Sequence, residues 1–335
     1  MRFVLSVLMC LAAGTAAADD FYKGKTITIS IGAGAGGTYE RYMRMLAEYW
    51  PRHIAGEPTV IVVNRPGTGG VNAANFVANA APKDGTHLGL TLNTVPLFQV
   101  AGGEGVKFNI GELQWIGNMW AATGIVAVSD RAPAKTLEAA KSAEVILGCV
   151  GRGSETFIVP QVMNTLLGSK FKCVMGYTGI AQIDLAIERG EVYGRGGSWY
   201  SFLETRPEWV KDKKIIPLVQ IAFVKDPTIP EVPLLVDLAR NPKERTVFEL
   251  VSSSAPFSRA PFAPPGVPKE RIELLRRAFD KTMADPEFLA AMKQRNVEIG
   301  PNTGEELQKI AANLLKTPAD QVAMLKQALE FDKAK

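Results

Sequence analysis

Several residue types are scarce in this sequence, and each scarcity argues against a class of function. Only two histidines occur in 335 residues. Neither has a cysteine or a second histidine at metal-ligand spacing, so we expect no metal site. No G-x-S-x-G motif is present, and no base accompanies a candidate nucleophile, which gives hydrolysis little support. The formal net charge of +4 arises without a lysine- or arginine-rich block, so we expect no nucleic-acid partner.

Long apolar runs are also missing after the first residues. Residues 1–18 combine an arginine, a short apolar run and an A-x-A ending, the pattern of a secretory signal peptide. We predict cleavage after Ala18 and export to the periplasm, because no later segment approaches the roughly 18 apolar residues of a membrane helix. Cys10 could mark a lipoprotein, but the large Met9 stands where a small residue is required.

Two cysteines remain after cleavage, Cys149 and Cys173. Both lie near the ends of predicted strands, at 144–150 and 171–175. Export permits a disulfide between them. The alternative is a pair of small, buried apolar residues, and the sequence leaves both interpretations open.

Short β-rich runs alternate with helical runs along the chain, which predicts parallel α/β sheets. The chain is long enough for two domains. We expect one lobe from 19–119 and 225–335, and a second from 120–224 that includes the crossover strands. Pro217 predicts an edge or crossover strand for the run that contains it. Strands are predicted at 26–31, 59–63, 87–93, 124–129, 144–150, 171–175, 191–197 and 214–224.

The glycines of "IGAGAGGT" satisfy G-x-G-x-x-G between a predicted strand and a predicted helix. A dinucleotide site also expects an acidic residue at the end of the second strand. That strand ends instead in Asn64 and Arg65, and export argues against a dinucleotide cofactor. We therefore expect no cofactor.

Small-residue turns recur after the predicted strands, as in "NRPGTGG", "NTVP", "GRGSET", "GYTG" and "GRGGSW". Each turn alone could be a mere connection. Ligands of open parallel sheets bind beyond the carboxyl ends of the strands, where all these turns fall. Glycine backbones and helix N-termini together form an anion site without a cationic side chain. The turns therefore predict a shared cleft for an anion.

The sequence resembles the extracytoplasmic solute receptors of tripartite tricarboxylate transporters, often called the Bug family. The resemblance covers essentially the whole mature chain, and N-R-P-G-x-G-G followed by A-P-x-D-G-T is its most specific part. It implies a type II periplasmic-binding-protein fold, with two α/β lobes and a ligand cleft between them. The matching stretches are "YKGKTITISIGAGAGGTYERYMRMLAEY", "VVNRPGTGGVNAANFVANAAPKDGTHLGL", "GCVGRGSETFIVPQVMNTLLGSKFKCVMGYTG" and "IAQIDLAIERGEVYGRGGSW", with a weaker match at "RAPFAPPGVPKERIELLRRAF".

The resemblance implies a monomeric receptor, not an enzyme, that binds a small organic carboxylate and delivers it to membrane permease subunits. A periplasmic sensor input or an enzyme on the same fold is the alternative. Backbone N–H groups and waters after the first two strands would hold the carboxylate, while the second lobe adds specificity. Glu40 and Tyr193 depart from the family pattern, which often has Asp at both positions. The predicted ligand-binding residues are Gly36, Gly37, Thr38, Tyr39, Thr68, Gly69, Thr94, Arg152, Gly153, Ser154, Tyr177, Ser198 and Trp199.

Three of the larger side chains near the predicted cleft have two interpretations each. Arg152 could pair with a second carboxylate, and Trp199 could stack on an aromatic ligand. Arg195 falls near the same mouth. The alternative is that the arginines face solvent and the tryptophan packs in the core.

Overall fold

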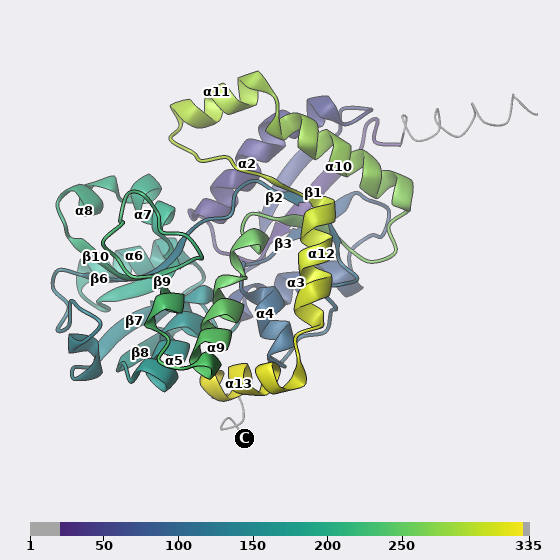
Figure 1. The fold of residues 1–335 in the computed structure, drawn as a ribbon. Coiled ribbons are helices and arrows are strands. Elements are labelled where there is room, and N and C mark those ends of the chain that lie inside the picture. Colours follow the sequence, from purple (N-terminus) through teal and green to yellow (C-terminus); the bar gives the residue numbers. More distant parts are fainter. Residues whose placement is uncertain (1–20, 331–335) are drawn as a thin grey trace, which may run out of the picture.

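The structure, a computed structural model, describes residues 21–330 and contains two five-stranded sheets flanked by helices (Figure 1). The predicted signal peptide and Cys10 lie outside the described residues. In spatial order the strands of the first sheet are β2 (Thr59–Asn64), β1 (Thr26–Ile31), β3 (His87–Leu90), β11 (Pro261–Ala263) and β4 (Gln114–Trp115). This sheet is parallel over β2, β1 and β3, and antiparallel where β11 joins β3 and β4 joins β11.

The second sheet has the same mixed character. In spatial order its strands are β10 (Ile215–Ile221), β6 (Gly124–Ser129), β9 (Gly194–Ser198), β7 (Val145–Cys149) and β8 (Phe171–Met175). Strands β9, β7 and β8 run parallel, whereas β6 is antiparallel to β9 and β10 is antiparallel to β6. Strand β10 lies at the edge, as Pro217 predicts, and its pairing shifts register just after that residue. A third, two-stranded sheet pairs β5 (Gly117–Asn118) with β12 (Asn302–Thr303).

The helices bury one apolar face each, as their periodicity predicts. Helix α2 buries Tyr42, Met43 and Leu46, and α6 buries Ile183 and Ile187. The helices are α2 (Thr38–Tyr49), α3 (Val71–Asn79), α4 (Val95–Val100), α5 (Glu155–Leu167), α6 (Ile180–Arg189), α7 (Trp199–Thr205), α8 (Pro207–Lys211), α9 (Pro242–Ser252), α10 (Lys269–Met283), α11 (Pro286–Gln294), α12 (Gly304–Leu315) and α13 (Ala319–Leu329).

The eight predicted strands lie close to their predicted positions, with two shifts at the ends that matter for the site, whereas β4, β5, β11 and β12 were not predicted. Strand β3 stops at Leu90, so residues 91–94 form a turn and not the end of a strand. Strand β9 begins at Gly194 and ends at Ser198, which brings Ser198 to the last position of the strand. The strand–helix alternation indicated the parallel pairings, but it did not indicate that β4, β6, β10 and β11 each join a sheet in antiparallel pairing.

Helix α13 packs against α5 and α9, so this helix lies beside the second sheet (Figure 1). Helix α12 instead contacts β4 of the first sheet and β5 of the two-stranded sheet, and α10 also contacts β5. The division of the chain into two lobes, with boundaries at 119/120 and 224/225, stays a prediction. A test of it must show to which lobe α9 and α13 belong. Among residues 21–330, none of the helices is both long enough and apolar enough to cross a bilayer.

Cys149 and Cys173 form a disulfide, which decides between the two interpretations that the sequence left open. They lie on the adjacent parallel strands β7 and β8, where Leu147 is opposite Cys173 and Cys149 is opposite Met175. The two Cα atoms are 5.6 Å apart, within the usual range for a disulfide. The bond joins two strands just before the turns that follow them.

Candidate ligand-binding site

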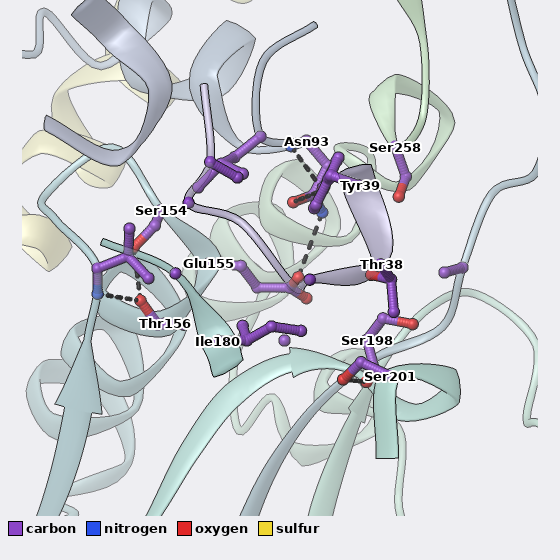
Figure 2. A pocket seen from close by; sticks show the side chains of 18 residues that line it. Thr38, Tyr39, Asn93, Ser154, Glu155, Thr156, Ile180, Ser198, Ser201 and Ser258 are labelled. Carbon is purple, nitrogen blue, oxygen red and sulfur yellow. Dashed lines mark hydrogen bonds between the residues drawn. The ribbon is translucent and has the colours of Figure 1, made fainter. Parts of the chain in front are cut away.

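A cavity of about 50 Å³ lies at the carboxyl ends of the parallel strands of both sheets (Figure 2). The turns after β1 and β3 form one side of it, and the turns after β7, β8 and β9 form the other. Antiparallel strands bring their amino ends to the same edge, which explains why residues just before β6 and β11 also contribute. The lining residues are Ala33, Gly34, Gly37, Thr38, Tyr39, Leu92, Asn93, Ala122, Val150, Ser154, Glu155, Thr156, Gly179, Ile180, Gly197, Ser198, Ser201 and Ser258.

Helices α2, α5 and α6 all begin at this cavity. Their N-cap residues are Gly37, Ser154 and Gly179, and none of these caps its helix through a side-chain hydrogen bond. The first N–H groups of a helix have no intrahelical acceptor, and the aligned peptide dipoles place partial positive charge there. The cavity therefore receives backbone donors and positive potential from both sheets without a lysine or arginine in its wall.

One serine hydroxyl adds a further donor. The Oγ of Ser198 is buried and has no hydrogen-bond partner in the described structure. Ser258 Oγ accepts a hydrogen bond of 2.8 Å from Arg259 Nη1, and the Ser258 hydroxyl is also hydrogen-bonded to Tyr39, so it is already engaged. Ser201 Oγ donates to the Ser198 carbonyl at 2.6 Å and so is already engaged. Figure 2 shows Ser198 and Ser201 beside Thr38 at one side of the cavity.

A hydrogen-bonded chain crosses the cavity from the first sheet to the second (Figure 2). The Asn93 N–H donates to Tyr39 Oη at 3.1 Å, and the Tyr39 hydroxyl donates to Asn93 Oδ1 at 3.2 Å. The Asn93 amide nitrogen then donates to Glu155 Oε2 at 3.4 Å. Burial raises the pKa of Tyr39, so its hydroxyl stays protonated and keeps its place in this chain.

Glu155 places a carboxyl group in the wall of the cavity. It is the first residue of α5 and only 8% exposed. Burial raises the pKa of Glu155 to about 7, against the opposing effects of the Asn93 hydrogen bond and of the charges on Arg259 and Arg195. This carboxyl group therefore changes its protonation state close to neutral pH.

Two buried arginines lie behind the wall. Arg195 is fully buried, forms an ion pair with Asp184 at 2.6 Å and stacks 3.8 Å from the centre of the Phe202 ring. It therefore does not face solvent at a cleft mouth. Arg259 is also buried, with its guanidinium 4.4 Å from the Tyr42 ring centre, and its Nε and Nη2 have no hydrogen-bond partner in the described structure.

The structure brings some of the predicted ligand-binding residues together at the cavity and places the others elsewhere. Gly36 lies outside the wall, and its N–H donates to Glu40 Oε2 at 2.6 Å. Trp199 is buried, and its indole N–H donates to Thr228 at 2.8 Å. The predicted residues in the wall are Gly37, Thr38, Tyr39, Ser154 and Ser198. Those outside the wall are Gly36, Thr68, Gly69, Thr94, Arg152, Gly153, Tyr177 and Trp199.

The turns at 67–70 and 151–154 contact each other, and of their residues only Ser154 lines the cavity. A Cβ atom on Gly69 would lie 2.6 Å from the Ser154 nitrogen, and one on Gly151 would lie 2.5 Å from the Gly69 nitrogen. The hydroxyl of Thr94 donates to the Gly153 carbonyl at 2.7 Å, which adds a side-chain bond to this contact. These glycines allow two backbones to meet, so their small size here serves the joining of the two sheets.

The remaining predicted residues lie on the second sheet. The Arg152 guanidinium lies 5.6 Å from the centre of the Phe157 ring, which belongs to α5. Tyr177 packs against the hydrophobic cluster around Ile183 and Trp209. Burial raises the pKa of Tyr177, so its hydroxyl stays protonated at neutral pH.

Sequence reasoning missed Asn93, Glu155 and Ser258. Asn93 and Glu155 stand within turns that the sequence singled out, next to Thr94 and Ser154, and their polarity was a usable signal. Ser258 carried no such sequence signal, because it lies just before the antiparallel strand β11, whose pairing brings it to the cavity.

Comparisons with known proteins agree with this architecture. Residues 43–325 match the model of the "Tripartite tricarboxylate transporter family receptor". A curated Cupriavidus necator protein, described as "UPF0065 protein in gbd 5'region", is 26% identical over 312 residues, which cover 90% of this chain and 87% of that protein.

Solved structures show the same fold. The periplasmic binding protein BugD superposes with a TM-score of 0.72 at 19% identity, over 92% of this chain and 98% of that one. An R. palustris protein solved with adipate superposes with a TM-score of 0.69 at 16% identity, over 90% of this chain and 97% of that one. MatC from Rhodopseudomonas palustris, with bound malate, superposes with a TM-score of 0.67 at 17% identity, over 91% of this chain and 99% of that one. The predicted periplasmic-binding-protein fold is confirmed, and the chain belongs to the tripartite tricarboxylate transporter receptor family.

Proposed function

We propose that this receptor captures a small organic carboxylate in the periplasm and delivers it to the membrane permease subunits of a tripartite transporter. The observation that carries the proposal is the convergence of α2, α5 and α6 on one cavity. In each of these helices the N-cap side chain makes no hydrogen bond to the first N–H groups. Related proteins of this fold were solved with adipate and with malate, which are both small dicarboxylates.

The donors in the wall are sufficient for useful affinity. A hydrogen bond to a charged group contributes about 1.5–3 kcal/mol, and a partly buried helix N-terminus up to about 2 kcal/mol. Several such contacts reach about −8 kcal/mol, which corresponds to a micromolar Kd. Ser198 supports the assignment, because a buried hydroxyl without a protein partner is stabilised when a ligand accepts its proton.

We further infer that the protein acts by binding alone, as a monomer, and that its two lobes close on the ligand like a hinge. The lobes would be residues 19–119 with 225–335, and residues 120–224. Contacts already join the two parts across the cavity, since the Gly34 N–H donates to the Thr178 carbonyl at 2.8 Å. A ligand held in the wall would add to these contacts and favour the closed arrangement.

Calorimetry of the exported protein with succinate, malate, adipate, citrate and benzoate tests the proposal, with succinamide as an uncharged control. We expect at least one acid to bind with a micromolar Kd and succinamide not to bind. Ser198→Ala should weaken that binding about tenfold or more through the lost bond to a charged group. Ser142→Ala, at an exposed position, should leave it unchanged. Failure of all these acids to bind would refute the proposal.

A further inference from the structure

The cavity proposed for a carboxylate already contains one carboxyl group. Glu155 is 8% exposed, and within the described structure it accepts one hydrogen bond, from Asn93 at 3.4 Å, and makes no ion pair. Its backbone position is set by the start of α5, and its Oε1 lies directly against Gly124, where an added Cβ atom would come within 1.9 Å of it. The glycine at position 124 therefore leaves open the space that the Glu155 carboxyl group occupies.

The charges around Glu155 leave it without a dedicated cation. Arg195, from β9, is ion-paired with Asp184. Arg259, from the segment before β11, donates to Ser258, and neither arginine comes within ion-pair distance of Glu155. From α2, Tyr39 stays neutral because burial raises its pKa. Within the described chain, no charged group on β6, β7, β8 or α13, the other elements packed against α5, interacts with Glu155.

An anionic ligand in this cavity would lie beside Glu155. Two ionised carboxylates that share one small site repel each other, and the usual outcome is that one of them holds a proton. The hydroxyl and amide donors of the wall can serve the ligand's oxygens, but none of them neutralises Glu155.

Resting on the proposed function, we propose that Glu155 is protonated when the cavity is filled and donates its carboxyl O–H to the ligand's carboxylate. Where Glu155 is ionised in the free protein, each anion captured brings one proton from solvent, and this proton remains on Glu155 while the ligand is bound. The neutral carboxyl group acts as a specificity-determining donor, matched to a ligand oxygen and not to a ligand ammonium group.

The free protein holds that proton with a pKa of about 7, so its share of protonated Glu155 falls as pH rises. Below pH 7 the proton is already in place, and binding of the anion is unimpeded. Above pH 7 the proton must be taken up at the moment of binding, and the affinity falls about tenfold for each pH unit.

Calorimetry between pH 6.5 and 8.5 tests this, with the acid from the panel above that binds most tightly. The affinity of the native protein should fall about 25-fold across this range. In buffers of different ionisation enthalpy at pH 8.5, the heat should report the uptake of close to one proton. The Glu155→Gln variant donates an N–H at every pH, so its affinity for the acid should change less than threefold between pH 6.5 and 8.5. At pH 8.5 it should bind the acid more tightly than the native protein does. Glu138→Gln, at an exposed ion pair, should follow the native profile.

An affinity that does not depend on pH, with no proton uptake, would overturn this inference while leaving the proposed function intact. Tighter binding at high pH, or a preference for aspartate over succinate that Glu155→Gln abolishes, would show that Glu155 pairs with a cation instead. If no acid binds at any pH, the proposed function fails and this inference fails with it. The buffer comparison uses the native protein, so it stands even if the Glu155→Gln variant does not fold.

Discussion

Replacement of Thr94 by valine should weaken ligand binding although Thr94 does not line the cavity. The Thr94 hydroxyl is buried and donates to the buried Gly153 carbonyl at 2.7 Å, which joins the two turns that meet between the sheets. Valine has nearly the same shape but leaves that carbonyl without its donor. A buried acceptor left unsatisfied costs about 1–3 kcal/mol. If closure of the lobes forms this bond, the closed state loses a factor of about 5 to 150 in population.

The assay is calorimetry with the carboxylate that binds most tightly, together with small-angle scattering of the free protein. Thr94→Val should raise the Kd by up to the same factor for every ligand, and should increase the radius of gyration. Thr94→Ser is the matched control, because it keeps the hydroxyl and should stay close to the native protein. Equal losses in both variants, or unchanged binding in Thr94→Val, would show that the bond to Gly153 does not stabilise the closed state.

Further predictions concern the contacts around the cavity. Removal of the disulfide by the double change Cys149→Ala and Cys173→Ala should lower the free energy of unfolding by about 3.5 kcal/mol, from the loop-entropy relation at a sequence separation of 24, in denaturant titrations. Gly34→Ala places a Cβ 2.7 Å from Thr178 Oγ1, and this overpacking should cost the closed state about 1–3 kcal/mol, seen as a higher Kd in calorimetry. The raised pKa of Glu155 means that the folded protein holds a proton which the unfolded chain releases. The free energy of unfolding should therefore fall as pH rises from 4.5 to about 7 in the native protein, and not in Glu155→Gln.

Strands with a clear apolar period were predictable from the sequence, and very short strands were not. "TITISI" and "GIVAVS" are long enough to show their β-rich character, and both form strands close to the predicted positions. Strands β4 (Gln114–Trp115) and β11 (Pro261–Ala263) are too short to show any period. Because those strands join the first sheet in antiparallel pairing, the sequence could not show that Ser258 lies at the ligand edge.

The glycine turns show a different limit of sequence reasoning. A glycine indicates that something approaches the backbone closely, but it does not say whether that neighbour is a ligand or another part of the chain. At Gly37 the neighbour is the cavity, whereas at Gly69 it is the backbone of Ser154. Glu155 was missed for a related reason, since an acidic residue in the first turn of a helix is common and usually only favours the helix.

The cavity wall is assembled from many short pieces of chain, each contributing a few atoms. Tyr39, Asn93, Glu155, Ser198 and Ser258 come from different helix starts, turns or strand ends, separated by long stretches of sequence. A chimera that exchanged any one of these turns with a relative would therefore inherit only a fraction of the ligand preference. Divergence of specificity within such a scaffold is expected to proceed by scattered single replacements, and a search for receptors with shared ligands should compare these dispersed positions together.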